Sequence, residues 1–82
     1  MLVEHRMEAG SVFPWHSHPH EQTVFVLEGE LDVETEEAGA ICRRHAVGGD
    51  SWVVPGGVPH RVTAVRASRV LDFFTPFRED YL

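Results

Sequence analysis

Short runs of alternating hydrophobic and polar residues dominate the chain, and turns containing glycine or proline separate them about every 8 to 12 residues. Successive side chains of a strand point to opposite faces, so this two-residue period predicts β-strands with one buried face. Helix signals are nearly absent. The predicted strands lie at residues 2–7, 12–18, 23–28, 30–35, 41–45, 51–54, 60–65 and 69–74. The pattern predicts an all-β sandwich or barrel, in which residues 75–82 form a short helix or an ordered loop.

The second and third predicted strands assign the central residues of the chain to two faces. One face carries the even positions His16, His18, His20, Gln22, Val24 and Val26. Because this face continues into valines, we expect it to line the interior of a barrel, provided that no bulge interrupts the strand at Pro19. The opposite face ends in Phe25 and Leu27, two large apolar side chains that a monomer would expose. These two residues predict a subunit interface and a homodimer.

The chain has 82 residues and one cysteine, Cys42. This length fits one domain, residues 1–82, whose small core needs support from a disulfide, a metal or a partner subunit. An internal disulfide is excluded, which leaves the metal and the partner. The net charge of −6 argues against nucleic acid and anionic membranes as partners. No apolar run is long enough to span a membrane, and residues 1–5 do not resemble a signal peptide, so we expect a cytoplasmic protein.

Three histidines form the strongest candidate for a chemical site. His16 and His18 stand two residues apart on one predicted strand, a spacing at which both imidazoles can bind the same ion. His60 follows the turn at residues 55–59, which would swing the next strand back across the barrel, and it is the candidate third ligand. The alternative is a structural network of the three rings. A zinc finger is excluded because the chain has no pair of cysteines.

Two motifs give these histidines a family context. The first consists of Gly10, five residues, His16-Ser17-His18, three residues, Gln22, six residues and Gly29. The second consists of Gly49, five residues, Pro55-Gly56-Gly57, two residues and His60. In both spacings the chain resembles the cupins, small β-barrel proteins of the double-stranded β-helix, or jelly-roll, type. The resemblance spans most of the chain and implies a cupin-type barrel with one divalent transition metal.

The chain departs from the cupin pattern at two positions. Gln22 stands where the family has an acidic ligand, and Ala64 stands where the second motif often ends in asparagine. Glu21 is an alternative ligand, but it would break both flanking spacings and would point away from His18. Some cupins use three histidines and one glutamine. The resemblance therefore implies a ligand set of His16, His18, Gln22 and His60.

A glutamine ligand has chemical consequences. Its amide oxygen is neutral and a weaker donor than a carboxylate, so a bound divalent ion keeps its full charge. Such a site favours an anionic ligand in its open positions and acts as a Lewis acid. It fits poorly with oxygen-activating Fe(II) sites, which use two histidines and one carboxylate. Imidazole and amide oxygen suit Zn, Ni, Mn, Fe and Co alike, so the sequence does not select among these metals.

A second cluster of candidate residues lies near the C-terminus. Alternation places Val70, Asp72 and Phe74 on one face, and on an interior face Asp72 would be a carboxylate that can serve as general acid or base. Arg78 could hold a substrate carboxylate in a two-pronged contact. Alternatively, Asp72 lies on the outer face beside an arginine, and residues 78–80 form a solvated tail.

This ending is similar to that of the pectin-degradation cupins, which open monosaccharide 4,5-unsaturated uronates to the linear keto form. Their pattern Asp-x-Phe-x-x-x-Arg, followed by Glu-Asp, corresponds here to Asp72, Phe74, Arg78, Glu79 and Asp80. The resemblance implies that Asp72 moves a proton, that Arg78 holds the anion and that Phe74 shapes the pocket. Thr75-Pro76-Phe77 departs from the commoner Ser-Pro-Pro of that subgroup.

The sequence thus predicts a metal-dependent isomerase or tautomerase acting on an unsaturated uronate or a similar small anionic carbohydrate. Two alternatives stay open, a non-catalytic cupin that binds a small ligand and an Fe(II)-dependent dioxygenase. The remaining histidines take no part in these predictions. His5 and His45 are interpreted as surface or hydrogen-bonded residues, and His20 either supports the metal ligands or faces solvent.

Overall fold

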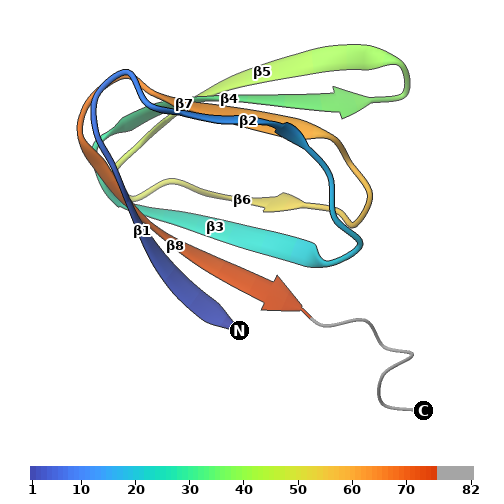
Figure 1. The fold of residues 1–82 in the computed structure, drawn as a ribbon, viewed down its shortest axis with the longest axis horizontal. Coiled ribbons are helices and arrows are strands. Elements are labelled where there is room, and N and C mark those ends of the chain that lie inside the picture. The colour runs from blue at the N-terminus through green and yellow to red at the C-terminus, as the bar shows by residue number, and fades with distance from the viewer. Residues whose placement is uncertain (76–82) are drawn as a thin grey trace.

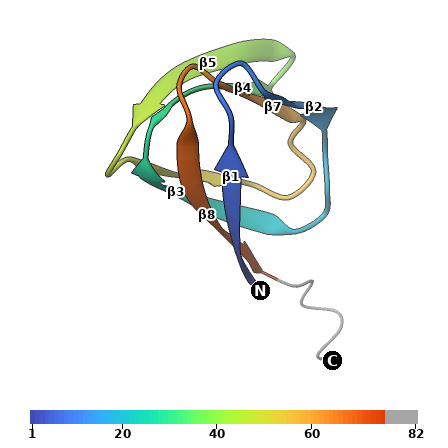
Figure 2. The ribbon, with the colours of Figure 1, turned by 60° about the vertical axis from the view of Figure 1, so that its left-hand side comes forward.

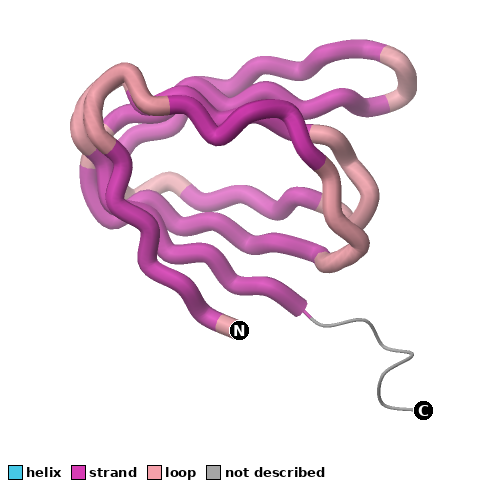
Figure 3. The backbone as a smooth tube through the Cα atoms, viewed as in Figure 1, coloured by secondary structure: helices cyan, strands magenta, loops and turns pink. Residues whose placement is uncertain are grey.

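The computed structural model describes residues 1–75, which form two antiparallel sheets and no helix (Figures 1 and 3). The strands are β1 (Leu2–Met7), β2 (Val12–His16), β3 (Glu21–Glu28), β4 (Glu30–Glu37), β5 (Ala40–Val47), β6 (Ser51–Val54), β7 (His60–Ala64) and β8 (Ser68–Thr75). The predicted all-β fold is confirmed, and every predicted strand is present. The prediction was wrong at the end of β2, because this strand stops at His16 and leaves His18 in the following loop.

The two sheets face each other, and most connections cross from one to the other, which is the jelly-roll arrangement (Figure 2). One sheet has the strand order β1-β8-β3-β6 and the other has the order β2-β7-β4-β5. In the first sheet β3 pairs with β8, so that Gln22 is opposite Phe74 and Val24 is opposite Asp72. This register brings the C-terminal cluster beside the segment that carries Gln22.

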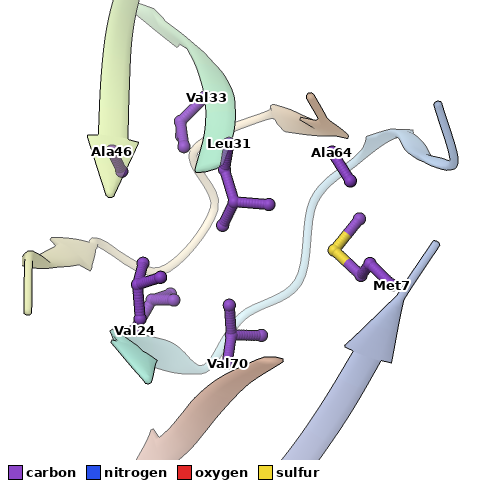
Figure 4. Close-up of a cluster of buried hydrophobic side chains, with 8 residues drawn as sticks. Met7, Val24, Leu31, Val33, Ala46, Ala64 and Val70 are labelled. Atoms are coloured by element: carbon purple, nitrogen blue, oxygen red, sulfur yellow. The ribbon is translucent and has the colours of Figure 1, made fainter. Parts of the chain in front are cut away.

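The hydrophobic core fills one end of the space between the sheets. Its buried residues are Met7, Val24, Val26, Leu31, Val33, Ala46, Ala64 and Val70, and most of them are shown in Figure 4. Inward residues of β3 run from Gln22 to Val26, and those of β7 run from His60 to Ala64. The apolar ends of these strands meet in the core. Their polar ends, Gln22 and His60, therefore lie together at the other end.

Gly29 joins the two sheets at the turn between β3 and β4. Its φ angle is +111°, and a Cβ atom at this position would overlap the side chain of Ser68 and lie 2.6 Å from its Cα. The Ser68 hydroxyl accepts a hydrogen bond from the backbone N–H of Glu30 at 3.0 Å. The glycine that ends the first sequence motif is thus required by the close approach of β8 to this turn.

The outer face of the β1-β8-β3-β6 sheet carries an apolar patch beside the ion pairs of Glu4, Arg6 and Arg69. Its exposed large side chains are Leu2, Phe25, Val53 and Phe73. Leu2 lies opposite Phe73 in the register, and Thr23 lies between Phe73 and Val53. Phe25 is 41% exposed, as the alternation predicted. Leu27 was expected to be equally exposed and is half-buried.

Candidate metal centre

Three histidine rings meet between the two sheets at the polar end of the barrel. His16 ends β2, His60 begins β7, and the two residues are partners in the antiparallel register. Their ring centroids are 4.2 Å apart, and the His18 ring lies 5.0 Å from that of His60. One nitrogen from each ring can be chosen so that the three atoms all lie within 4.8 Å of one another. This is the spacing of donors that can hold one metal ion.

The second nitrogen of each ring is engaged by the backbone. Nδ1 of His16 lies 2.7 Å from the carbonyl oxygen of Pro14. Nδ1 of His18 and Nδ1 of His60 each lie 2.9 Å from a carbonyl oxygen, that of His20 and that of Val58 respectively. A carbonyl can only accept, so each Nδ1 carries the proton and donates it. The lone pairs are therefore on the three Nε2 atoms, which is how backbone carbonyls orient histidine ligands in metal sites.

His60 shows the clearest need for a further partner. The residue is only 3% exposed, and its Nε2 is a buried atom with no hydrogen-bond partner. Burial lowers the pKa of His60, and His16 and His18 lower it further, whereas the Val58 carbonyl and Asp72 act in the opposite direction. The neutral ring keeps an Nε2 lone pair free for coordination. A cation at this point would satisfy an atom that is otherwise left unpaired.

Gln22 adds a fourth donor. Its amide N–H donates to Oδ1 of Asp72 at 2.9 Å, which fixes the direction of the amide and turns its Oε1 toward His18. Oε1 then lies 3.0 Å from Nε2 of His18, although neither atom carries a proton. Two ligands at about 2.1 Å from one cation and at right angles to each other are separated by about this distance. The residues present fit a divalent transition metal.

The loop between β2 and β3, which carries His18, is held close to the turn that precedes β7. The backbone N–H of Gly57 donates to the carbonyl oxygen of His18 at 2.7 Å. A Cβ atom on Gly56 would overlap the carbonyl oxygen of Pro19, so only glycine permits this approach. On the outer face, the guanidinium of Arg61 lies 5.3 Å from the Trp15 ring, across the register shift in β2. These contacts tie together the three segments that supply the histidines.

The three histidines line a cavity of about 170 Å³. Its walls are formed by His5, Phe13, His16, His18, Gln22, His60, Val62, Asp72 and Phe74. A larger hollow of about 490 Å³ lies over β4, β5 and β7 and contains none of the three histidines. Both acidic side chains in this hollow are paired, Glu34 with Arg43 and Arg61 and Asp32 with His45, as in the contact of Arg61 Nε with Glu34 at 2.8 Å. The chemistry of the donors therefore favours the smaller cavity as the site.

Asp72 lies inside this cavity, and the alternative of an outward Asp72 paired with an arginine is wrong. The residue is 5% exposed, and its two oxygens face Gln22 and His5. Phe74 also lines the cavity, with its ring 5.6 Å from that of His18 in an edge-to-face contact. Glu21 is exposed and does not line the cavity, so Gln22 rather than Glu21 faces the histidines. Arg78 lies outside the described residues.

His5 is a polar cavity residue that the sequence interpretation did not place in the site. It was interpreted as a surface or hydrogen-bonded residue, and the 3.1 Å contact of its Nε2 with Oδ2 of Asp72 agrees with a hydrogen-bonded residue, but its ring also lines the cavity. The signal was present in the alternation of β1, because His5 shares a face with the buried Met7. His20 supports His18 through its carbonyl oxygen. His45 is on the outside, 2.8 Å from Asp32, as expected for a hydrogen-bonded surface residue.

Comparison with known proteins places this geometry in a family. The sequence profile described as "Cupin domain" matches residues 3–74. The chain belongs to the cupin family. Two solved cupin structures are each 33% identical to this cupin and cover all of it. They are KdgF from Halomonas sp., with a TM-score of 0.84 over 74% of that chain, and an RmlC-like cupin from Shewanella frigidimarina, with a TM-score of 0.82 over 70% of that chain.

More distant structures share the fold alone. Oxalate decarboxylase from Bacillus subtilis is 24% identical and has a TM-score of 0.88, but the match covers 96% of this cupin and only 22% of that chain. No curated protein sequence matches the chain significantly. Within residues 1–75 there is no helix of the length and apolar character that crossing a membrane requires.

Proposed function

We propose that this cupin is a metal-dependent isomerase or tautomerase that acts on an unsaturated uronate or a similar small anionic carbohydrate. The observation that carries the proposal is the direct link between Gln22 and Asp72. One amide offers its oxygen to the ligand cluster and its N–H to a buried carboxylate. A neutral ligand set and a group able to move protons thus share one cavity.

The ligand set argues for an anionic substrate. His16, His18, His60 and Gln22 bring no negative charge to the centre, so a divalent ion bound there keeps an unneutralised charge for a substrate oxygen and acts as a Lewis acid. The cavity of about 170 Å³ is smaller than the roughly 300–1,000 Å³ of sites for drug-sized ligands. We infer a single sugar ring rather than an oligosaccharide.

The proposed reaction is a balanced proton shift without any redox step. The hemiacetal hydroxyl of an unsaturated uronate loses its proton, the ring C–O bond breaks to release an enolate, and the enolate takes a proton on carbon to become the keto form. Asp72 lies within the cavity to accept and return a proton. Phe74 would form the wall of the pocket beside the sugar ring. The sequence prediction that Arg78 holds the substrate carboxylate is part of the same proposal.

Turnover of a 4,5-unsaturated galacturonate, followed by ¹H NMR, tests the proposal. Metal-loaded protein is expected to accelerate formation of the linear keto product, whereas chelator-treated protein is expected to lack this acceleration and Asp72→Asn to keep only a small residual turnover. The metal content of Asp72→Asn should equal that of the wild type, because asparagine keeps an oxygen that can accept the Gln22 N–H and position 72 supplies no metal ligand. Saturable binding without product would instead indicate a non-catalytic cupin that binds a small ligand, and iron-dependent oxygen uptake would indicate a dioxygenase.

We further propose that the chain, a single domain at residues 1–82, forms a cytoplasmic homodimer. Leu2, Phe25, Val53 and Phe73 are between 41% and 56% exposed on one sheet face. Apolar side chains that gather on one exposed face can mark a protein–protein contact. An obligate dimer buries about 2,000 Å² or more, which would support the small core. Light scattering at micromolar concentration should give the mass of a dimer, and Phe73→Glu should give that of a monomer; a monomeric wild type contradicts the proposal.

A further inference from the structure

Asp72 has two oxygens to satisfy in a buried position, and Gln22 occupies one of them. The residue is 5% exposed, and its Oδ1 accepts the Gln22 amide N–H at 2.9 Å. Its Oδ2 faces Nε2 of His5 at 3.1 Å. A buried carboxylate is costly unless both oxygens have polar partners. His5 therefore completes the surroundings of Asp72.

The strand register explains why His5 reaches this point. β1 pairs with β8 so that Val3 is opposite Asp72 and His5 is opposite Val70. His5 and Asp72 are thus diagonal neighbours on the inner face, a distance that a long side chain can bridge. The His5 ring packs edge-to-face against Phe13, with centroids 5.3 Å apart and an interplanar angle of 74°. This aromatic contact holds the ring in the orientation that points Nε2 at the carboxylate.

We propose that His5 is a positioning residue that fixes the Asp72 carboxylate for proton transfer. With Oδ1 held by Gln22 and Oδ2 held by His5, the carboxylate cannot turn about its terminal torsion. It keeps its remaining lone pairs directed into the cavity that the substrate enters. The arrangement follows the logic of a catalytic base oriented by a third group. The catalytic part of this inference rests on the proposed function, whereas the positioning itself does not.

Four variants test the inference through turnover, namely His5→Leu, His5→Gln, Asp72→Asn and the double variant His5→Leu/Asp72→Asn. His5→Leu removes the contact and is expected to lower kcat about 10-fold with little change in KM, because the substrate keeps its other contacts. His5→Gln keeps an N–H donor and should recover most of the loss. His5→Leu should cost nothing further in the Asp72→Asn background, because it acts through Asp72. Equal losses in both backgrounds would overturn the inference.

The side-chain amide of Gln22 provides a readout that needs no activity. In ¹⁵N NMR its resonance should move in His5→Leu, when Asp72 loosens, and return in His5→Gln. His45→Gln, a change on the outer face, should leave the resonance in place. If His5→Leu does not fold, His5→Asn, which is polar but too short to reach Oδ2, takes its place. If the Gln22 resonance moves in His5→Leu but the wild-type protein shows no turnover, the positioning is upheld and the proposed function is refuted. If the resonance does not move, the positioning is overturned.

Discussion

Adding one methyl group at Gly56 should weaken metal binding although Gly56 is not a ligand. A Cβ atom at this position would overlap the carbonyl oxygen of Pro19 and lie 3.2 Å from its carbonyl carbon. The obstacle is backbone, so the loop must move by roughly 1 Å to restore an ordinary contact distance. The adjacent Gly57 N–H holds the His18 carbonyl at 2.7 Å, so the displacement reaches His18. Metal sites tolerate shifts of only about 0.2 Å in ligand distance.

We expect Gly56→Ala to lower the free energy of unfolding by about 1–3 kcal/mol, as overpacking does. Affinity for Zn²⁺ should fall at least about 10-fold, which corresponds to about 1.4 kcal/mol. Isothermal titration calorimetry and urea denaturation of the metal-free protein measure the two effects. Gly48→Ala is the matched control, because a Cβ atom there would make an ordinary contact of 3.4 Å with the Leu27 carbonyl. Wild-type affinity in Gly56→Ala would refute the reasoning.

Three further changes test other parts of the structure. Gln22→Glu places a carboxylate against Asp72 in place of an N–H donor, so turnover should fall about 10-fold or more while metal is retained in elemental analysis; unchanged turnover would contradict this. Val26→Ala should cost about 2 kcal/mol in urea denaturation, because Val26 is fully buried, and an unchanged midpoint would count against it. The hydrogen bond to Asp32 raises the pKa of His45 above its ordinary 6.5. The stabilisation that this hydrogen bond gives is complete below pH 6.5 and is lost as the pH rises through the raised pKa. His45→Gln should therefore flatten the dependence of the free energy of unfolding on pH in this range.

Much of the fold was predictable because the barrel has a buried inner face. Val24 and Val26 had to point inward for the chain to acquire a core, and the two-residue period then carried Gln22 to the same side. The alternation acts between neighbours in sequence and is therefore visible in the pattern of residues. The motif glycines were recognisable by their spacing, although the cause at Gly29 is a contact with Ser68 of β8, which lies far along the chain.

The details of the site depend on departures from a regular strand. The pairing of β2 with β7 shifts between Phe13 and His16, and β2 ends before His18. His18 reaches the cluster because the Gly57 N–H holds its carbonyl, a contact that strand alternation does not contain. The approach of His5 to Asp72 depends on which strands are neighbours and on their register, and a two-residue period fixes neither.

The contact between Gln22 and Asp72 gives a physical reason for an amide where other cupins have an acidic ligand. A carboxylate at position 22 would meet Asp72 at about the 2.9 Å now occupied by a hydrogen bond, and two carboxylates that close cannot both stay ionised. The amide removes this conflict, because its oxygen turns to His18 while its N–H turns to Asp72. The negative charge therefore lies on Asp72, which contacts the ligand Gln22 but is not itself a ligand. His5 holds this side chain in place. The ligand set stays neutral and Asp72 stays an acceptor, which are the two conditions that the proposed proton transfer requires.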